Sequence, residues 1–501
     1  MSQAPESAFH RWQGRPVVIL GLSKTGEAVA RYLQAFGADV FLSERSEPGP
    51  DAAALRDRLQ AFGCAVETGA HSEQCLSHAP LMIVSPGIPP HAEILQRAAA
   101  AGIEIISEVE LAARENRLSR RLPIAAVTGS NGKTTTTTLI ARLLADSGQR
   151  VVACGNIGLP MISCLGDNAL EALVVELSSA QLAFSPTFQA TVAAFMNLTP
   201  DHINWHGSLA AYEAAKRRLF TGEQVPTWAV VNADDPASLR WQADLPEQTL
   251  WFSRRDPHLG QKRAHAAFLT ADGQFVFQRD DCPQPLGLSA ADLKLKGAHN
   301  HENALAALSV AFLMHAAGTN TTGQTFARTC REFSGVAHRI EPAGEITRLH
   351  AGGVTRIACY NDSKATNTDA AIQALRAFSP QRTILIAGGR PKEEPLEGFV
   401  EAIQTHAAAV TLLGEAQPRF QRALNEAGYS AVYPCDTLER ALDKAIALSQ
   451  GEPILFSPAC ASFDQYQNFE HRGDVFKALI AQRQATPTPD AQPDRARPSC
   501  L

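Results

Sequence analysis

The chain has 501 residues, 45% of them hydrophobic, which is enough for about three domains with complete cores. Its formal net charge of −6 argues against nucleic-acid binding, because proteins that bind nucleic acids usually carry a basic face. No apolar run approaches the length that spans a membrane, and residues 1–6 lack the basic-then-apolar pattern of a signal peptide. We therefore expect a cytoplasmic protein with no nucleic-acid or membrane partner.

Ten cysteines are scattered through the sequence, and no two of them form a C-x-x-C pair. Such pairs mark many zinc sites and redox motifs, and secreted proteins often arrange their cysteines as a disulfide framework. We expect instead reduced, partly buried thiols, with neither a disulfide framework nor a zinc site.

The N-terminal region has the pattern of a β-α-β unit, as in dinucleotide-binding folds. A strand over residues 16–20 is followed by the turn Gly21-Leu-Ser-Lys-Thr-Gly26, a helix over 27–36 and a second strand over 39–42. Ser23 stands where the G-x-G-x-x-G fingerprint requires its second glycine, which argues against a dinucleotide. The turn is either purely structural or a site for another phosphorylated ligand.

The first domain continues with another strand and ends in a polar segment. Residues 81–90 predict a strand that runs into a rigid, proline-bearing loop. Residues 113–122 are rich in Arg, Glu and Asn, which predicts a solvated helix end and linker. We place the first domain boundary at residue 121.

A strand, a glycine turn and a helix follow directly. The apolar run Ile124 to Val127 predicts a buried strand, and the turn after it holds Gly129 and Gly132. Lys133 and a run of threonines then open an amphipathic helix. Glycines let backbone N–H groups approach phosphates, and the helix N-terminus adds a favourable dipole. In such an element Lys133 lies near the terminal phosphates and the Thr134 hydroxyl binds Mg²⁺.

This element departs from the standard phosphate-loop pattern. The motif G-x-x-x-x-G-K-[ST] requires a glycine at Val127, whereas the turn here has only G-x-x-G-K-T. So short a motif also occurs in ordinary strand-to-helix turns. The predicted strand before it and the helix after it favour nucleotide binding.

Two polar groups stand where the next predicted strands end, the edge at which parallel α/β sheets bind ligands. Glu176 is the only charge in an apolar strand, and a strand over 192–197 runs into Thr199-Pro-Asp-His202. A buried carboxylate is costly unless it is paired or bound to metal. Glu176 is therefore a Mg²⁺ ligand, which we favour, or a hydrogen-bond partner, while His202 alone more often is an ordinary loop histidine.

The second half of this domain carries a hairpin and a helix. Asp272-Gly273 between alternating apolar residues over 268–277 predicts a two-residue hairpin that adds antiparallel strands. A helix opens after Leu295, with Asn300 and Asn303 facing the same way because they lie three residues apart. Capping accounts for Asn300 but not for the pair.

From residue 342 strands again alternate with helices, which predicts another parallel sheet. The expected strands cover 357–360, 383–387, 410–413 and 454–456. Polar loops follow three of them, at 361–367, 388–392 and 457–465. From residue 485 the chain is rich in Pro, Asp and Arg, which predicts a disordered tail. We expect an α/β protein of three domains, Rossmann-like, P-loop ATPase-type with a mostly parallel sheet and an added antiparallel hairpin, and Rossmann-like. They cover residues 1–121, 122–341 and 342–484, with the tail over 485–501.

Several separated motifs, in this order, resemble those of the Mur ligases, ATP-dependent amide-forming enzymes of peptidoglycan synthesis. They are Thr128-Gly-Ser-Asn-Gly-Lys-Thr-Thr135, Glu176-Leu-Ser-Ser179, Asn197-Leu-Thr-Pro-Asp-His202, His299-Asn-x-x-Asn303 and His338-Arg-Ile-Glu341. The resemblance covers nearly the whole chain except the tail. It is greatest to the branch that adds D-glutamate to UDP-N-acetylmuramoyl-L-alanine. The motifs for this branch are Asn361-Asp-Ser-Lys-Ala-Thr-Asn367, Lys392, Ser457-Pro-Ala-Cys-Ala-Ser462 and Asn468-Phe-Glu470.

The resemblance implies roles for individual residues in binding ATP and two Mg²⁺ ions. The phosphates and first Mg²⁺ would be held by Gly129, Ser130, Asn131, Gly132, Lys133, Thr134, Thr135 and Glu176. His202 and Lys216 would hold the second Mg²⁺, with Lys216 as a carbamate, an oxygen anion suited to that ion. The remainder of ATP would meet Asn300, Asn303, Arg339 and Asp362. Lys216 has no other support, because its Lys-Arg-Arg run is typical of a solvated helix face.

The same resemblance implies the two other substrate sites. The UDP-sugar would lie near Lys24, Thr25, Gly26, Arg45, Ser85 and Asn156. The incoming glutamate would be held by Lys364, Thr366, Lys392, Ser462 and Phe469. Catalysis would rest on Lys133, Glu176, His202 and Lys216 and would proceed through an acyl phosphate, with domain closure assembling the site.

Three alternatives to this interpretation remain open. The chain could use L-glutamate, since lysines hold the carboxylates of either enantiomer. It could be a sibling Mur ligase or a folylpolyglutamate-type ligase. Finally, it could be a nucleotide-dependent binding protein without catalysis, although such a protein has no need of two metals. We expect a monomer in each case.

Overall fold

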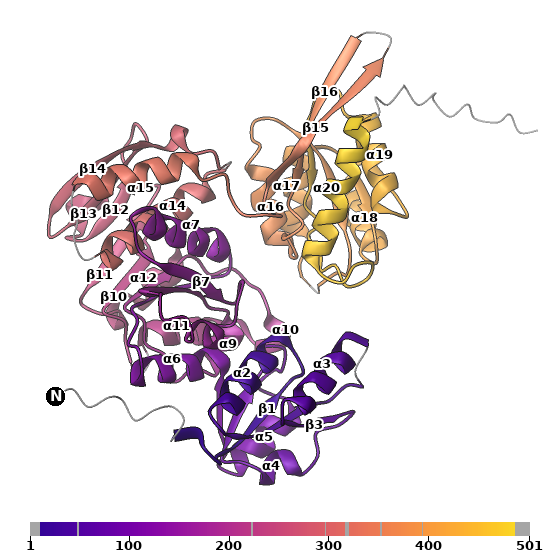
Figure 1. The fold of residues 1–501 in the computed structure, drawn as a ribbon. Coiled ribbons are helices and arrows are strands. Elements are labelled where there is room, and N and C mark those ends of the chain that lie inside the picture. Colours follow the sequence, from indigo (N-terminus) through magenta and orange to yellow (C-terminus); the bar gives the residue numbers. More distant parts are fainter. Residues whose placement is uncertain are drawn as a thin grey trace, which may run out of the picture. The chain divides into compact units, whose positions relative to one another are not determined.

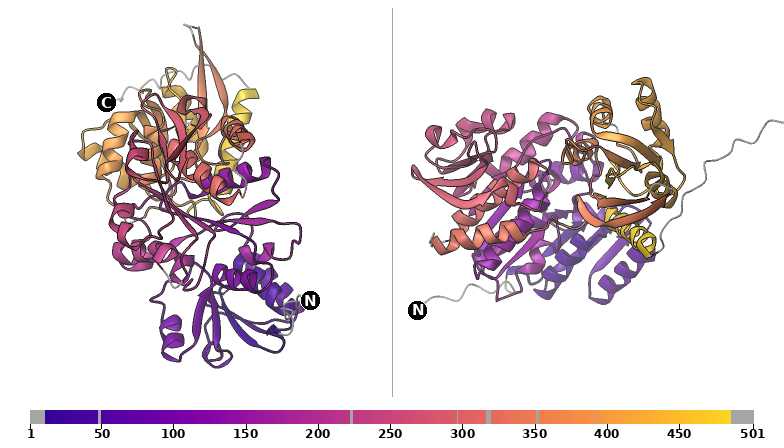
Figure 2. Two further views of the ribbon diagram at one scale, coloured as in Figure 1. Left: turned by 90° about the vertical axis from the view of Figure 1, so that its left-hand side faces the viewer. Right: turned by 90° about the horizontal axis from the view of Figure 1, so that it is seen from above.

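The computed structural model describes residues 11–47, 50–221, 224–295, 297–315, 320–350, 353–392 and 394–485. They form three β-sheets covered by helices (Figures 1 and 2). The chain divides into two compact units, Met1–Leu293 with His301–Phe333 and Lys294–Asn300 with Ser334–Leu501. Apart from Ala485, the predicted tail lies outside the described residues. No helix in these described ranges combines the length and apolarity that crossing a membrane requires.

The first sheet is parallel and has the strand order β3-β2-β1-β4-β5. Its strands are β1 (Pro16–Leu20), β2 (Asp39–Glu44), β3 (Ala65–Thr68), β4 (Leu81–Val84) and β5 (Glu104–Ser107). Its helices are α2 (Lys24–Ala35), α3 (Pro50–Ala61), α4 (Gln74–Ser77), α5 (Glu93–Ala100) and α6 (Glu108–Leu118). Val17 and Ile19 belong to the core on one face, and Val18 and Leu20 to the core on the other, so both faces are covered.

The second sheet has the order β14-β13-β12-β11-β10-β9-β6-β8-β7 and is parallel except at the β12–β13–β14 edge. Its strands are β6 (Ile124–Thr128), β7 (Val151–Gly155), β8 (Ala172–Glu176), β9 (Val192–Phe195), β10 (Trp228–Asn232), β11 (Thr249–Ser253), β12 (Ala266–Leu269), β13 (Gln274–Arg279) and β14 (Cys282–Ser289). Strand β6 lies between β9 and β8 and is buried along its length. The loop that follows β6 therefore starts from the rigid middle of the sheet.

Helices cover both faces of this second sheet. They are α7 (Lys133–Asp146), α8 (Met161–Cys164), α9 (Ser179–Ala183), α10 (Ile203–His206), α11 (Leu209–Thr221), α12 (Pro236–Trp241), α13 (Leu259–Lys262), α14 (His299–Met314) and α15 (Asn320–Glu332), with 3₁₀ turns at Gln242–Asp244 and Ala290–Asp292. Several begin at side-chain caps. Ser178 and Gln181 form a capping box at α9, and Asp235 caps α12 before Pro236.

The first two sheets share one core, which explains why they form a single unit. Side chains of α2 and α6 pack in the same hydrophobic cluster as those of β8 and β9. Polar contacts join them too, since Ser107 and Ser185 hydroxyls lie 2.7 Å apart and Glu110 accepts from the Thr187 N–H at 3.2 Å. The domain boundary near residue 121 stays a prediction.

The segment 113–122 is less solvated than predicted. Glu115 and Asn116 on α6 are buried. The Glu115 carboxylate accepts from Arg11 at 2.6 Å, Trp12 at 3.2 Å and Tyr32 at 2.9 Å. A polar composition suggested exposure, but these tertiary partners satisfy the carboxylate inside the fold.

The third sheet has the order β15-β16-β20-β17-β18-β19 and belongs to the second unit. Its strands are β15 (Glu341–His350), β16 (Gly353–Asn361), β17 (Thr383–Gly388), β18 (Ala407–Leu413), β19 (Val432–Pro434) and β20 (Ile454–Phe456). Its helices are α16 (Thr368–Arg376), α17 (Glu397–His406), α18 (Gln417–Glu426), α19 (Leu438–Leu448) and α20 (Phe469–Ala485). The sheet is parallel except for the long β15–β16 pair, which extends beyond the rest of the unit (Figure 1).

The predicted α/β class and the three sheets are confirmed, with differences in one loop and in several strands. The β12–β13 hairpin exists, but its loop is longer than two residues. Leu269 pairs with Phe275, the Thr270 N–H donates to the Gln274 carbonyl, and Gly273 adopts a φ of +79°. Strands β3, β5, β15 and β19 were not predicted, and the sequence of β15 lacks a clear apolar alternation.

Candidate active site

The loop between β6 and α7 needs both of its glycines. A Cβ on Gly129 would lie 2.8 Å from the Met196 Cβ, and one on Gly132 would lie 2.3 Å from the Asn303 Oδ1. Gly132 also caps α7 in the left-handed region, at a φ of +84°. The loop is therefore packed against β9 on one side and α14 on the other, with the N–H groups of α7 opening onto it.

Hydrogen bonds hold this loop against the segment that follows β9. The Asn131 N–H donates to the Asn197 side-chain oxygen at 2.8 Å, and the Asn197 amide donates back to the Asn131 carbonyl at 3.3 Å. The Ser130 hydroxyl lies 2.9 Å from the Thr199 carbonyl and 2.8 Å from the Tyr212 hydroxyl. The loop thus has a fixed shape before any ligand arrives, which lowers the entropic cost of binding.

Two lysines point into the loop. Lys133 donates to the carbonyl oxygens of Gly129 and Ser130 at 2.9 and 2.8 Å. Lys216 on α11 donates to the same Gly129 oxygen at 2.7 Å, and its Nζ lies 4.5 Å from the Tyr212 ring centroid. Lys216 is only 1% exposed, while Arg217 and Arg218 stay at or near the surface. Of the three residues in the Lys-Arg-Arg run, only the two arginines belong to the solvated face of the helix.

The burial of Lys216 changes its protonation. Loss of solvation, and then the nearby charge of Lys133, hold the pKa of Lys216 well below its usual value, although Asp201 and Glu176 oppose this shift. A low pKa favours the neutral amine, and only the neutral amine is a nucleophile.

The two carboxylate oxygens of Glu176 differ in their contacts, and one of them suits a metal ion. The side chain is 2% exposed at the end of β8, and its Oε1 accepts from the Asn156 amide at 2.8 Å. Its Oε2 is buried and has no hydrogen-bond partner among the described residues. A buried carboxylate oxygen without a partner is costly, and Mg²⁺ binds carboxylate oxygens. The two predicted roles of Glu176 are therefore compatible, because Oε1 accepts the hydrogen bond and Oε2 is available to a cation.

His202 lies at the surface, and its ring centroid is 6.4 Å from that of Tyr212. It adopts a left-handed φ of +53°, its side chain is 55% exposed, and its Nε2 lies 3.6 Å from the Asp201 carboxylate. His206, which the sequence did not single out, is more buried and lies 2.9 Å from the Ser179 hydroxyl. Burial, and then the charges of His202 and Lys216, lower the pKa of His206 to about 4. Its signal in the sequence was only a second histidine four residues after the first.

The other residues predicted near ATP divide between the two units. In the first unit Asn303 is buried. Its side-chain oxygen lies where a Cβ on Gly132 would point, and it accepts from the Thr136 hydroxyl at 3.4 Å. Thr134 and Thr135 are buried in the first turn of α7. Asn300, Arg339 and Asp362 belong to the second unit.

Three of the six predicted UDP-sugar residues, Lys24, Gly26 and Ser85, lie at the carboxyl edge of the first sheet. Ser23 caps α2, and its hydroxyl lies 3.1 Å from that of Ser85. A Cβ on Gly26 would lie 2.3 Å from the Gly21 carbonyl oxygen, so this glycine serves the packing of α2 against the turn. Lys24 donates to the Gly158 carbonyl at 2.9 Å, which links α2 to the loop after β7.

The remaining three members of that set lie around this cluster. Asn156 is exposed on the loop after β7 and contacts Glu176, while Thr25 follows Lys24 on α2. Arg45 is exposed just after β2. Glu44 was missed by the sequence analysis. Its carboxylate accepts from the Leu22 N–H at 2.9 Å and so fixes the β1–α2 turn.

The loops predicted to hold glutamate are organised in the second unit by Arg472, which the sequence did not single out. Arg472 is 1% exposed. Its guanidinium donates to the Ser363 hydroxyl at 2.9 Å, the Ser363 carbonyl at 2.7 Å, and the Cys460 carbonyl at 3.0 Å. One side chain thus joins the loop after β16 to the loop after β20. A lone arginine in a helix gives no periodic signal of such a role.

The predicted glutamate residues lie on or beside these loops. Lys364 Nζ is 5.3 Å from the Phe469 ring centroid, and the Phe469 carbonyl accepts from the Ser363 hydroxyl at 2.8 Å. Ser462 is buried, and Thr366 and Lys392 are half-buried on the loops after β16 and β17.

Asp362 holds the linker that enters this sheet. Its carboxylate accepts from the Ile340 N–H at 3.2 Å and the Ser457 hydroxyl at 2.7 Å. Burial raises its pKa to about 6, although the Arg339 charge opposes the shift. Arg339 itself is half-buried between His338 and Ile340, both at positive φ.

A glycine loop between a buried central strand and a helix N-terminus is the arrangement of phosphate-binding α/β proteins. Three family descriptions match the chain in order: "Mur ligase MurD-like, N-terminal domain" over residues 15–107, "Mur ligase middle domain" over 127–311 and "Mur ligase, glutamate ligase domain" over 345–460. The chain belongs to the Mur ligase family.

Relatives of known name agree with this assignment over nearly the full length. A UDP-N-acetylmuramoylalanine–D-glutamate ligase of Koribacter versatilis is 36% identical over 93% of this chain and 97% of its own. One of Myxococcus xanthus is 37% identical over 93% and 98%.

Solved structures show the same fold at lower identity. MurF from Acinetobacter baumannii matches with a TM-score of 0.56, 17% identity, and coverage of 90% of this chain and 91% of its own. MurC from Thermotoga maritima matches with a TM-score of 0.53, 20% identity, and coverage of 94% and 99%.

Proposed function

We propose that this chain joins D-glutamate to UDP-N-acetylmuramoyl-L-alanine at the expense of ATP, and that it does so in the cytoplasm as a monomer, for peptidoglycan synthesis. The observation that carries the proposal is the similarity to ligases of this name along 93% of the chain. The chain is accordingly an ATP-dependent acid–amino-acid ligase. Its three proposed domains, 1–121, 122–341 and 342–484, each carry one substrate.

The phosphates of ATP are assigned to the loop from Gly129 to Thr135. This assignment is supported by the fixed shape of the loop and by the N-terminus of α7, which begins directly after Gly132. Two Mg²⁺ ions are assigned to Thr134, Glu176, His202 and Lys216, and supply charge neutralisation for the phosphates. The orphan oxygen of Glu176 supports the assignment, as does the neutral amine that burial favours at Lys216. Such an amine adds CO₂ and loses a proton, which gives the carbamate.

The chemistry has two steps. A carboxylate oxygen of the UDP-sugar substrate attacks the γ-phosphorus of ATP, and the bond from that phosphorus to ADP breaks. The amine of D-glutamate then attacks the acyl carbon, and phosphate leaves with the electrons of its bond while the nitrogen loses a proton. Lys133 holds the phosphates, and the loops tied together by Arg472 position the amine.

The remaining sites follow the same logic. The UDP-sugar is assigned to Lys24, Thr25, Gly26, Arg45, Ser85 and Asn156, and Arg45 suits the diphosphate because a guanidinium binds such anions through two bonds. Glutamate is assigned to Lys364, Thr366, Lys392, Ser462 and Phe469. Asn300, Asn303, Arg339 and Asp362 are assigned to the nucleoside side of ATP.

The test is release of ADP by the purified chain with ATP, Mg²⁺ and UDP-N-acetylmuramoyl-L-alanine, with D-glutamate and L-glutamate in separate reactions. We expect release with D-glutamate only. Release with L-glutamate only would keep the mechanism and replace the substrate. No release with either, together with intact ATP binding, would contradict the proposal and favour a sibling ligase or a binding protein.

A further inference from the structure

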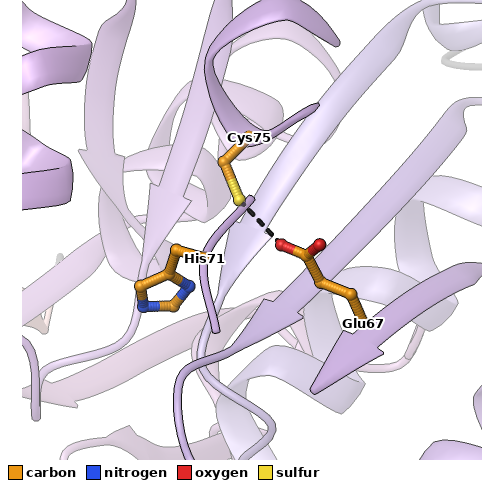
Figure 3. Close-up of side chains that lie close together, drawn as sticks. All are labelled: Glu67, His71 and Cys75. Carbon is orange, nitrogen blue, oxygen red and sulfur yellow. Dashed lines mark hydrogen bonds between the residues drawn. The ribbon is translucent and has the colours of Figure 1, made fainter. Parts of the chain in front are cut away.

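Metal-ligating side chains also gather away from the phosphate loop, at the carboxyl edge of the first sheet. Glu67 lies on β3, His71 on the loop after it, and Cys75 on α4 (Figure 3). One ligand atom from each lies within 4.8 Å of the other two. We propose that Glu67, His71 and Cys75 bind one Zn²⁺ ion.

The distances within this group suit a zinc ion after small side-chain movements. Tetrahedral Zn²⁺ has bonds of about 2.0–2.3 Å, so its ligand atoms lie about 3.3–3.8 Å apart. Cys75 Sγ is 3.1 Å from Glu67 Oε1. The Ser43 hydroxyl lies between the other two ligands, 2.6 Å from Glu67 Oε1 and 2.7 Å from His71 Nδ1. Rotation of Ser43 opens the space that the ion requires.

The donor set selects zinc over the Mg²⁺ of the ATP site. Thiolate and imidazole are ligands of zinc and similar transition metals, whereas Mg²⁺ prefers oxygen. Cys75 is fully buried, and Glu67 and His71 are half-buried, so the ion would be shielded yet reachable from solvent. Three protein ligands leave a fourth position for water.

Without metal the same atoms form a hydrogen-bonded network. Glu67 Oε1 accepts from the Ser43 hydroxyl, from the Ser72 N–H at 3.0 Å, and from the Cys75 thiol. The thiol therefore carries its proton. Binding of Zn²⁺ forms a metal–sulfur bond and releases that proton to solvent, so the affinity rises with pH.

The spacing Glu67-x₃-His71-x₃-Cys75 is not the C-x-x-C pattern whose absence argued against zinc. The loop that carries His71 already contacts the segment that follows β2, since the Gly69 N–H donates to the Ser46 carbonyl at 3.3 Å. A bound ion would fix this loop near Arg45, whose charge acts on His71. The ion would thus hold β3, the loop after it and α4 together at the edge of the sheet that carries the proposed UDP-sugar residues.

The experiment is a Co²⁺ titration of the metal-free, full-length chain carrying Cys282→Ser, which removes an exposed thiol and with it a competing ligand for Co²⁺. We expect one thiolate-to-Co²⁺ absorption band at a 1:1 ratio, lost on addition of Zn²⁺ but not of millimolar Mg²⁺. Cys75→Ser should abolish the band. His71→Ala should weaken Co²⁺ binding at least about tenfold, because even the loss of a residue that only supports a metal ligand typically costs about 10–100-fold in metal affinity.

Ser43→Ala separates a metal site from a hydrogen-bonded network. It removes the hydroxyl at the centre of the network and leaves the three ligands, so we expect Co²⁺ binding to be retained or tightened. Zn²⁺ should also raise the melting temperature of the parent protein but not that of His71→Ala, whose half-buried side chain is removed without opening the core. A band that survives Cys75→Ser, or no band at a tenfold excess of Co²⁺, would overturn the proposal.

Discussion

The side-chain nitrogens of Lys133 and Lys216 converge on one acceptor, the Gly129 carbonyl oxygen, at 2.9 and 2.7 Å. Burial of Lys216 and the nearby charge of Lys133 both oppose a second cation at this point, so the neutral amine is favoured at Lys216. An anion would instead be attracted by the charge of Lys133. The phosphates of ATP would supply one such anion, and conversion of the Lys216 amine to a carbamate would supply another.

Lys216→Arg tests this interpretation. Arginine carries a fixed positive charge and has no amine that adds CO₂, so we expect the rate of ADP release to fall by about 10²–10³-fold, as when one preorganised catalytic group is lost. Arg217→Lys, on the adjacent half-buried position, should stay within about twofold. A Lys216→Arg enzyme with near-normal kcat would exclude a carbamate at this position.

Gly132→Ala should damage the phosphate loop. The φ of +84° and the approach of Asn303 Oδ1 to 2.3 Å from the new Cβ both oppose the substitution. We expect a loss of about 1–3 kcal/mol of stability and a KM for ATP at least about tenfold higher. Gly148→Ala at the other end of α7 is the control. Its φ of +96° carries the same strain, but nothing lies within 4 Å of its Cβ. If both variants keep normal KM values for ATP, the loop does not bind the nucleotide.

Glu108 should make stability depend on pH. Burial raises its pKa from 4.5 to about 7, although backbone N–H groups of Ile162 and Met161 oppose the shift. The folded state therefore binds more protons than the unfolded state between those values, and stability falls as pH rises through them. At full burial the loss is on the order of 3 kcal/mol.

Glu108→Gln removes this titration. At pH 4 the difference in stability between Glu108→Gln and the parent protein should reflect packing alone. Between pH 4 and pH 8 the parent protein loses stability and the variant does not, so the difference should shift in favour of the variant. Denaturant midpoints at pH 4, 6 and 8 give the measurement. Glu104→Gln, at an exposed neighbouring carboxylate, should follow the parent curve. Parallel curves for Glu108→Gln and the parent protein would show that Glu108 has an ordinary pKa.

Arg472→Lys should impair glutamate binding selectively. Lysine cannot replace the planar donor group that reaches Ser363 and Cys460 together, so the two loops lose their common partner. We expect a KM for glutamate at least about tenfold higher with the KM for ATP within about twofold, since a hydrogen bond from a charged group is worth about 1.5–3 kcal/mol. Steady-state kinetics with each substrate varied in turn provide the measurement.

Arg483→Lys on the same helix is the control for Arg472. Its partners, Glu439 and Asp443, are exposed, and surface ion pairs contribute little. Equal effects of the two substitutions on both KM values would assign Arg472 to general stability rather than to the glutamate loops.

Local sequence was enough to indicate many of the strands and helices and the phosphate loop. The apolar runs at 16–20, 124–128 and 454–456 became strands because each offers enough side-chain area to be buried on both faces. Gly129 and Gly132 were recognisable because only glycine allows their φ values and close approaches. The order of the motifs was enough to indicate the family.

Only the tertiary structure decided which polar residues are buried and what they contact. Lys216, Glu115 and Arg472 stand in polar stretches that resemble solvated helix faces, yet each is at most 2% exposed because distant segments cover it. The same holds for Glu67, His71 and Cys75, whose ligand atoms converge only because β3 and α4 pack beside Ser43 of β2. The burial of these side chains and the convergence of the ligand atoms depend on contacts between residues far apart in the chain. A local sequence pattern therefore does not predict them.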